Sequence, residues 1–162
     1  LGGPHLLGAW IRLAALAAAF PARQWTAVCI GRGTDDALVQ RRMRAPGDPV
    51  AVLRDLVAIY DTGRCEPIPL PIKTSFAWAS ARFANAANPG RRPQSPEAAA
   101  RRMWKYERED PAIEQIWGKD PELSVLLDPP SAVEDVEGEA TRMGAYAARL
   151  WLPMLQTVGS IG

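Results

Sequence analysis

The lysines of this chain bear on one kind of metal chemistry. A metal-dependent DNA nuclease of the restriction-enzyme type uses an Asp/Glu-x-Lys strand, in which the carboxylate holds the cation and the lysine activates water or steadies the phosphate. The 162 residues contain three lysines, and none has a carboxylate two positions before it. We therefore predict no catalytic residue and no metal ligand, and a protein that works by contact. The residues two positions before Lys73, Lys105 and Lys119 are Pro71, Met103 and Trp117.

The sequence also lacks the residues for other common site chemistry. His5 is the one histidine, which leaves a histidine metal site or a Ser/His/Asp arrangement without its usual members, and no Gly-x-Ser-x-Gly elbow is present. Cys29 and Cys65 are too few and too far apart for a zinc site, and they fit a reducing cytosol better than a disulfide scaffold. Lys73-Thr74 resembles the end of a phosphate-binding P-loop, but prolines precede it where glycines are needed. We therefore expect the protein to use no cofactor, and in particular no small-molecule cofactor.

The most apolar run, residues 6–20, contains Arg12 and is too short to cross a bilayer. It lacks the basic flank of a signal peptide, so the sequence predicts no membrane contact and a cytoplasmic location. The chain starts with Leu-Gly-Gly-Pro rather than methionine. We interpret it as a piece of a longer chain or as a processed end.

Arginines are the remaining candidates for a functional surface. Three of them, Arg41, Arg42 and Arg44, follow the second strand of a predicted hairpin. Arg91 and Arg92 lie on a proline-rich loop. Arginines in such places suit contacts to DNA phosphates, which are electrostatic and carry no sequence information. We predict DNA contacts at these five residues; the alternative is that they are ordinary solvated arginines.

Basic and aromatic residues elsewhere extend this hypothesis. One predicted helix carries Arg101, Arg102 and Lys105. Tryptophans can stack on the bases of single strands, although a tryptophan at helical spacing more often belongs to the core. The tryptophans considered for stacking are Trp25, Trp78 and Trp104.

The net charge of +1 hides a lopsided distribution. Residues 1–108 carry sixteen Lys/Arg against eight Asp/Glu, a balance of +8, and residues 109–162 carry three against ten, a balance of −7. Such polarity suggests nucleic acid at the basic part, and a partner or the basic part itself at the acidic part. The alternative is two solvated faces that partly neutralise each other. The length fits a single domain or domain fragment over residues 1–162.

The first half of the chain predicts a helix, a hairpin and a second helix. Residues 4–20 are apolar on nearly every face, which indicates a helix buried all round. The β-branched residues of 24–30 predict a strand, residues 33–36 a turn, and residues 37–43 a returning strand. Asp48-Pro49 is a strong helix start, and Gly63 predicts the end of that helix.

The second half predicts mostly helices. The prolines of residues 66–71 require an extended segment. Thr74 or Ser75 caps a helix that ends near Asn88, and Ser95-Pro96 opens another that runs to about Tyr106. Residues 109–136 are expected to be short helices or irregular, and residues 137–157 form the last helix. The fold class is therefore α+β, dominated by helices, with a small β-hairpin or sheet.

One segment, residues 60–75, resembles the C-terminal region of the RecC family. RecC is the gamma chain of exodeoxyribonuclease V, the RecBCD helicase–nuclease. Residues 13–18, 25–33 and 137–155 fit the same family, so the resemblance covers nearly the whole chain. The residues that carry the 60–75 motif are Tyr60, Asp61, Gly63, Glu66, Pro67, Pro69, Pro71, Lys73, Thr74 and Ser75.

The resemblance implies a fragment from the end of a much larger subunit. It implies the C-terminal part of a domain that is similar to the RecB nuclease fold, a restriction-nuclease-like fold, but has lost its catalytic residues; the 6–20 helix would match the helix after the active-site strands. It also implies a domain that supports a pin parting duplex strands, with double-stranded or forked DNA and RecB-like and RecD-like subunits as partners, in double-strand-break repair by homologous recombination. The hairpin of residues 25–43 is a candidate for the pin.

Two other functions stay open at this point. The first is a freestanding protein–protein docking module that makes no contact with DNA. The second is an active nuclease whose catalytic residues are supplied by sequence upstream of this chain.

Overall fold

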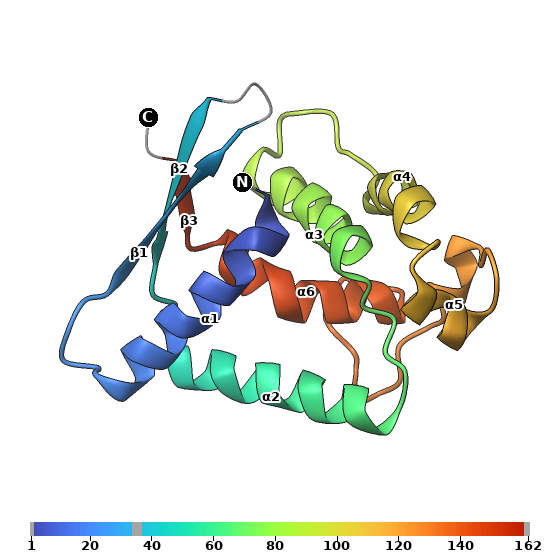
Figure 1. The fold of residues 1–162 in the computed structure, drawn as a ribbon, viewed down its shortest axis with the longest axis horizontal. Helices are drawn as coiled ribbons and strands as arrows, with labels where there is room; N and C mark the ends of the chain where they lie inside the picture. Colours follow the sequence, from blue (N-terminus) through green and yellow to red (C-terminus); the bar gives the residue numbers. More distant parts are fainter. Residues whose placement is uncertain (1, 34–36, 161–162) are drawn as a thin grey trace. The chain divides into compact units, whose positions relative to one another are not determined.

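Helices and one small antiparallel sheet make up the computed structural model, which describes residues 2–33 and 37–160 (Figure 1). The helix-dominated α+β fold predicted from the sequence is thereby confirmed, and so is the small sheet. In order, the elements of the described ranges are α1 (Gly3–Ala19), β1 (Thr26–Arg32), β2 (Leu38–Arg44), α2 (Pro49–Cys65), α3 (Ile72–Ala87), α4 (Pro96–Glu107), α5 (Pro111–Trp117), the 3-10 helix η1 (Leu123–Leu126), α6 (Arg142–Leu155) and β3 (Val158–Ser160).

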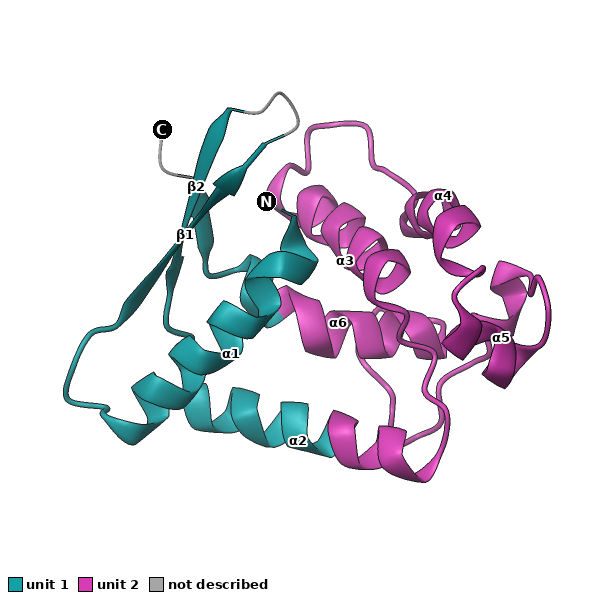
Figure 2. Ribbon diagram, viewed as in Figure 1, with its two compact units in different colours: residues 1–58, 153–162 teal, residues 59–152 magenta. Residues whose placement is uncertain are grey.

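The chain forms two compact units, coloured separately in Figure 2. Unit 1 comprises residues 1–58 and 153–162, and unit 2 comprises residues 59–152. This boundary does not follow the change from basic to acidic sequence at residue 108, because both sides of residue 108 belong to unit 2. That the 162 residues act as a single domain stays a prediction.

Unit 1 contains the sheet, α1 and the start of α2. The strands lie in the order β1-β2-β3, with both pairs antiparallel, and the hairpin register places Val28 opposite Arg42. The turn expected at residues 33–36 falls largely on residues 34–36, which lie outside the described ranges. Asp48 caps α2 as predicted, because its Oδ1 accepts a hydrogen bond of 2.9 Å from the Ala51 N–H.

Helix α1 buries one stripe rather than its whole surface, so the expectation of a helix buried all round is wrong. Trp10 is fully buried, whereas Gly8 and Ala15 on other faces are exposed. The reason is that alanine favours helix whether or not it is buried, so a run of alanines does not by itself indicate burial. The buried residues are Gly3, Leu6, Trp10, Leu13, Ala14 and Ala17.

Unit 2 contains the end of α2, then α3, α4, α5 and η1, and most of α6. Helices α3 and α4 pack side by side (Figure 1). Ser95 caps α4 as predicted, accepting a hydrogen bond of 3.1 Å from the Ala98 N–H. The core of unit 2 has many of its most buried side chains on α6, where Met143, Ala145, Ala147 and Trp151 have at most 1% of their surface exposed.

Helix ends differ from the prediction at two places. Helix α2 continues past Gly63 to Cys65, and Gly63 keeps a negative φ within it. Helix α6 starts at Arg142 instead of residue 137, since Gly138 at φ +80° leaves the helical conformation. Helix α6 ends at Leu155, close to the predicted end at residue 157, and the unpredicted strand β3 (Val158–Ser160) follows it. The pairing of β3 with β2 depends on a partner more than a hundred residues earlier in the chain. No helix in the described ranges has the length and apolar character to cross a bilayer.

Candidate functional site

The 60–75 motif runs from the last turns of α2 through an extended segment into α3. Its first residues, Tyr60 and Asp61, are exposed, whereas Pro69 and Pro71 are buried. The segment is therefore packed within this chain rather than left open. A Cβ at residue 63 would lie 3.4 Å from the Ile68 side chain, an ordinary van der Waals contact, so Ile68 packs directly against Gly63.

A carboxylate from α4 holds the start of α3. Glu107 accepts hydrogen bonds from the Lys73 N–H (2.9 Å), the Thr74 N–H (2.7 Å) and the Thr74 hydroxyl (2.7 Å). These backbone donors have no partner inside the helix, and a negative charge at a helix N-terminus is favourable. The prediction that Thr74 or Ser75 caps α3 is wrong: Pro71 occupies the N-cap position, and the capping carboxylate comes from another helix.

Thr74 and Ser75 are themselves fully buried. The Ser75 hydroxyl accepts a hydrogen bond of 3.0 Å from the indole N–H of Trp151 on α6. The neighbouring Phe76 meets the same indole edge-on, with ring centroids 5.0 Å apart. The end of the motif thus ties α3 to α6 through both a polar and an aromatic contact.

Glu66, in the middle of the motif, belongs to a second polar network, together with Arg142, Glu134 and Tyr146. Arg142 bonds Glu134 with both Nε (2.9 Å) and Nη2 (2.6 Å), and its Nη2 also lies 2.7 Å from Glu66 Oε1. The Tyr146 hydroxyl donates to Glu134 at 2.8 Å. Hydrogen bonding to Arg142 lowers the pKa of Glu134 from 4.5 to about 2, against the opposing effect of burial.

The same network also shifts the pKa values of Arg142 and Tyr146. The hydrogen bond to Glu134 raises the pKa of Arg142, and burial together with that carboxylate raises the pKa of the Tyr146 hydroxyl. Both shifts keep the arginine charged and the tyrosine neutral. The network is a structural tie between the motif, residues 131–134 and α6.

A second buried carboxylate, Glu139, lies between α3 and the start of α6. It accepts a hydrogen bond of 3.1 Å from the Trp78 indole and forms an ion pair with Arg82. Burial raises its pKa, and the Trp78 and Arg82 contacts act in the opposite direction. Gly138 is required beside this pair, because a Cβ there would collide with the Arg82 guanidinium and its φ of +80° is disfavoured for other residues.

The hairpin arginines do not share one face of the sheet. Arg42 and Arg44 are exposed and alternate with Met43, which is fully buried. Since side chains alternate between the two faces of a strand, Arg41 lies on the face of Met43 and is half-buried. The prediction of DNA contact at these residues is untested by the structure, but only two of the three arginines point to open solvent.

The other predicted arginines, Arg91 and Arg92, are exposed on the loop between α3 and α4. This loop is held by two hydrogen bonds of 2.8 Å, from the Asn85 side-chain amide to the Gln94 carbonyl and from the Gln94 N–H back to Asn85. The arginines thus lie on an anchored loop.

Two of the three tryptophans considered for base stacking belong to the core. Trp78 and Trp104 are buried, and their indole N–H groups donate to Glu139 and to the Pro121 carbonyl at 3.1 and 2.8 Å. Trp25 is half-buried and packs against Phe20 at a centroid distance of 6.2 Å. The stacking hypothesis is wrong for Trp78 and Trp104, because their hydrogen bonds belong to the core.

Unit 2 contains a groove that was not predicted from the sequence. Its volume is about 520 Å³, and its rim carries the exposed Arg102, Lys105 and Tyr106. The spacing of these three residues on α4 would have grouped them on one face, but the hollow beside them depends on α3. The residues that line the groove are Ala77, Ser80, Ala81, Gln94, Ala99, Arg102, Met103, Lys105 and Tyr106.

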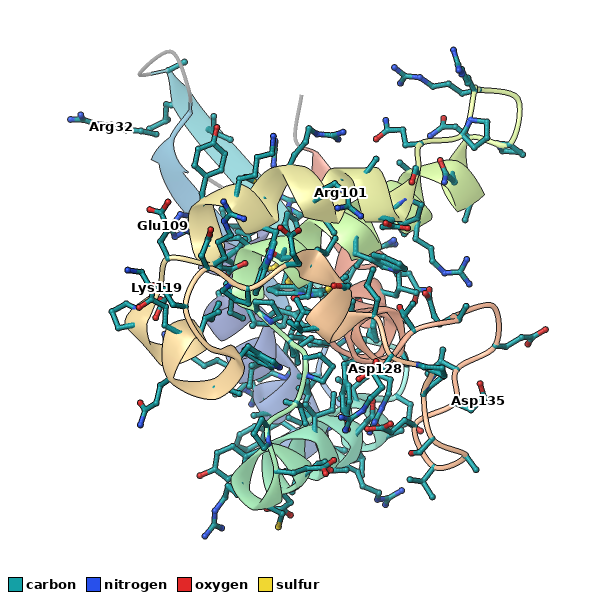
Figure 3. All side chains as sticks on the ribbon, turned by 90° about the vertical axis from the view of Figure 1, so that its right-hand side faces the viewer. Arg32, Arg101, Glu109, Lys119, Asp128 and Asp135 are labelled. Atoms are coloured by element: carbon teal, nitrogen blue, oxygen red, sulfur yellow. The ribbon has the colours of Figure 1, made fainter. Side chains whose placement is uncertain are left out.

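No group of three or more His, Cys, Asp and Glu side chains that could hold a metal ion occurs within residues 2–33 and 37–160. Asp35 and Asp36 lie outside those ranges. Figure 3 labels several other acids, among them Glu109, Asp128 and Asp135, which come from separate segments of unit 2.

Comparison with known proteins gives a consistent result. A family model described as "RecC C-terminal domain" matches residues 1–83. The chain is 48% identical to the "RecBCD enzyme subunit RecC" of Mycobacterium tuberculosis strain H37Rv, in an alignment of 168 positions that covers 99% of the chain. It is 48% identical over 161 residues, 96% of its length, to the protein of the same name from Mycolicibacterium smegmatis. The chain spans about 15% of the length of these relatives. No solved structure matches it significantly.

Proposed function

The chain belongs to the RecC C-terminal domain family, and from this premise we propose that it is a non-catalytic C-terminal part of a RecC subunit. Its relatives are named as subunits of the RecBCD enzyme. We extend to this chain a role in double-strand-break repair by homologous recombination, in which it supports the parting of duplex strands and docks RecB-like and RecD-like subunits. Catalysis would belong to those partners.

The observation that carries the proposal is the different use of polar residues inside and outside the molecule. Three polar side chains of the 60–75 motif bind groups of the chain itself: the half-exposed Glu66 and the buried Thr74 and Ser75. The arginines of the hairpin and of the 88–95 loop instead face solvent, with the exception of Arg41. Exposed cations on the surface of a folded unit suit contact with DNA phosphates.

Binding to forked DNA tests this proposal. We expect weak binding by the chain that falls steeply with salt, because each phosphate contact releases counterions. Replacing both exposed hairpin arginines, Arg42→Ala with Arg44→Ala, should reduce the slope of log K against log salt by about 1.8, at about 0.9 for each contact. The matched control removes two exposed arginines elsewhere in unit 1, Arg23→Ala with Arg54→Ala. Equal affinities for the two double variants would reject the placement of DNA on the hairpin.

A protein-docking function without DNA contact is favoured by a different observation. The sheet face that carries Arg42 and Arg44 also exposes large apolar side chains. These are Val28 (47%), Ile30 (62%) and Leu38 (77%). Exposed apolar residues gathered on one face often mark protein contacts. This alternative predicts no fork binding even at low salt, and loss of a partner subunit when Val28 and Ile30 are changed to serine.

Kinship with the RecB nuclease fold, and the hairpin as the strand-parting pin, remain part of the proposal. The alternative of an active nuclease requires an upstream acidic residue followed by a Glu-x-Lys strand in the longer protein. The sequence of the longer protein upstream of this chain would distinguish an active nuclease from a non-catalytic domain.

A further inference from the structure

The groove between α3 and α4 has a floor of small residues. Ala77 and Ala81 from α3 and Ala99 from α4 line it, and together they leave a hollow of about 520 Å³ beside the tightly packed helices. The Ser80 side chain also lines the groove, and its buried hydroxyl has no hydrogen-bond partner among the described residues. This hydroxyl oxygen is closed off from solvent, so it lies behind the surface of the groove.

The rim of the groove combines two cations with an aromatic ring. Arg102, Lys105 and Tyr106 lie three and four residues apart on α4 and therefore share one face of the helix. Tyr106 has 74% of its surface exposed, which is high for so large an aromatic residue. Within the described residues, neither Arg102 nor Lys105 takes part in an ion pair.

The surroundings of the groove are basic. Residues 91–106 contain five Lys/Arg and a single acid, Glu97. Glu97 is already engaged, since its carboxylate lies 2.7 Å from Arg101 one turn along the helix; Figure 3 labels Arg101 on α4. Two of the five cations, Arg91 and Arg92, lie on the anchored loop that leads into α4. The ligand of this surface must therefore carry negative charge.

We propose that the α3–α4 groove binds single-stranded DNA. Tyr106 stacks on one unpaired base, Arg102 and Lys105 contact the flanking phosphates, and the edge of a base enters the hollow. Any base can stack on an aromatic ring, so the site tolerates any sequence. This inference rests on the proposed DNA role and names the form of DNA that this part of unit 2 takes.

Two competing ligands fit the groove less well. The bases of a duplex are stacked and paired, so neither the tyrosine nor the hollow could be used by one. An acidic protein helix would anchor apolar side chains in an apolar groove, whereas this groove joins its alanine floor to Gln94 and two cations.

Photocrosslinking in the intact protein that carries this chain tests the inference. The probe is a single-stranded oligothymidylate in which 5-iododeoxyuridine replaces some thymidines, because this base crosslinks to an aromatic residue on which it stacks. We expect a crosslink in the tryptic peptide of residues 106–108 that contains Tyr106. Arg102→Gln with Lys105→Gln should lower its yield and reduce the salt slope of crosslinking by about 1.4, at about 0.7 per phosphate contact of a single strand.

Further variants separate the groove from general surface charge. Tyr106→Ala should weaken oligothymidylate binding about fivefold or more, as expected for a lost stacking contact, and Tyr106→Phe should restore it. Ala77→Met fills the hollow without changing any charge and should lower the crosslink yield, with its fold checked by circular dichroism. Arg64→Gln with Lys119→Gln removes two exposed cations elsewhere in unit 2 and should change nothing.

The outcomes separate this inference from the proposed function. Crosslinks that map only elsewhere, with fork binding intact, would overturn the groove but leave the DNA role standing. Loss of both fork binding and single-strand crosslinks would overturn both. If Arg102→Gln with Lys105→Gln released a partner subunit and left every crosslink unchanged, the groove would be a site for an acidic protein, contrary to the proposal.

Discussion

Glu134 offers a quantitative test of how the 60–75 motif is held. In the folded chain its carboxylate accepts bonds from Arg142 Nε and Nη2, from the Tyr146 hydroxyl at 2.8 Å and from the Ser131 N–H at 3.0 Å. Glu66, the other acid beside Arg142, has a side chain 53% exposed and can replace little of this. Glu134→Gln should therefore destabilise unit 2 substantially.

The magnitude follows from the pKa of Glu134, which these contacts lower from 4.5 to about 2. One pKa unit is worth about 1.4 kcal/mol, so the ionised carboxylate stabilises the folded state by roughly 3 kcal/mol at neutral pH. The folded-state pKa is the lower one, so this stabilisation is present above pH 4.5 and is lost as the pH falls towards 2. About 2 kcal/mol of it should be gone by pH 3.

The assay is urea denaturation of the wild type and of Glu134→Gln between pH 7 and pH 3. The difference in free energy of unfolding should narrow by about 2 kcal/mol over this range. Asp135→Asn is the matched control, because it removes a neighbouring carboxylate that is exposed, and it should leave the pH dependence unchanged. Parallel pH profiles for the wild type and Glu134→Gln would refute the assigned network.

Three further predictions test other contacts of unit 2. Glu107→Gln should destabilise the chain by about 1–2 kcal/mol and speed hydrogen exchange at the Lys73 and Thr74 amides, which Glu109→Gln on the exposed surface should not do; unchanged exchange in Glu107→Gln would exclude the carboxylate as the cap. Trp151→Phe should cost about 1 kcal/mol or more for the bond to Ser75, and a double-mutant cycle with Ser75→Ala should show coupling; full additivity would contradict the bond. Gly138→Ala should destabilise by about 1–3 kcal/mol in thermal melts, with Gly90→Ala on the open loop as the control, and equal melting temperatures for the two would argue against the strained position.

Features set by neighbouring residues could be predicted from the sequence. The Asp48 and Ser95 caps depend on groups three residues away, and the β1–β2 hairpin depends on strands separated by one turn. The helix-dominated fold and the family followed from patterns of this kind. The Asp110-Pro111 start of α5 was open to the same reasoning, since Asp110 caps that helix.

Features that join distant segments could not be predicted. The Glu107 cap lies 34 residues from Lys73, and the Glu66–Arg142 contact spans 76 residues. Nothing in the local sequence indicates which carboxylate meets which donor. For the same reason the sequence left both base stacking and the core open for Trp78 and Trp104. Neither β3 nor the groove between α3 and α4 was predicted.

The central claim is that this chain contributes charge and shape rather than catalysis, and one measurement tests it most directly. End-labelled forked DNA is incubated with the chain and Mg²⁺ at increasing salt, and bound and cleaved species are resolved on the same gel. We predict DNA that is retarded but intact, with the retardation lost as salt rises. Cleavage that requires the cation and disappears on replacement of a single acidic side chain would contradict the account.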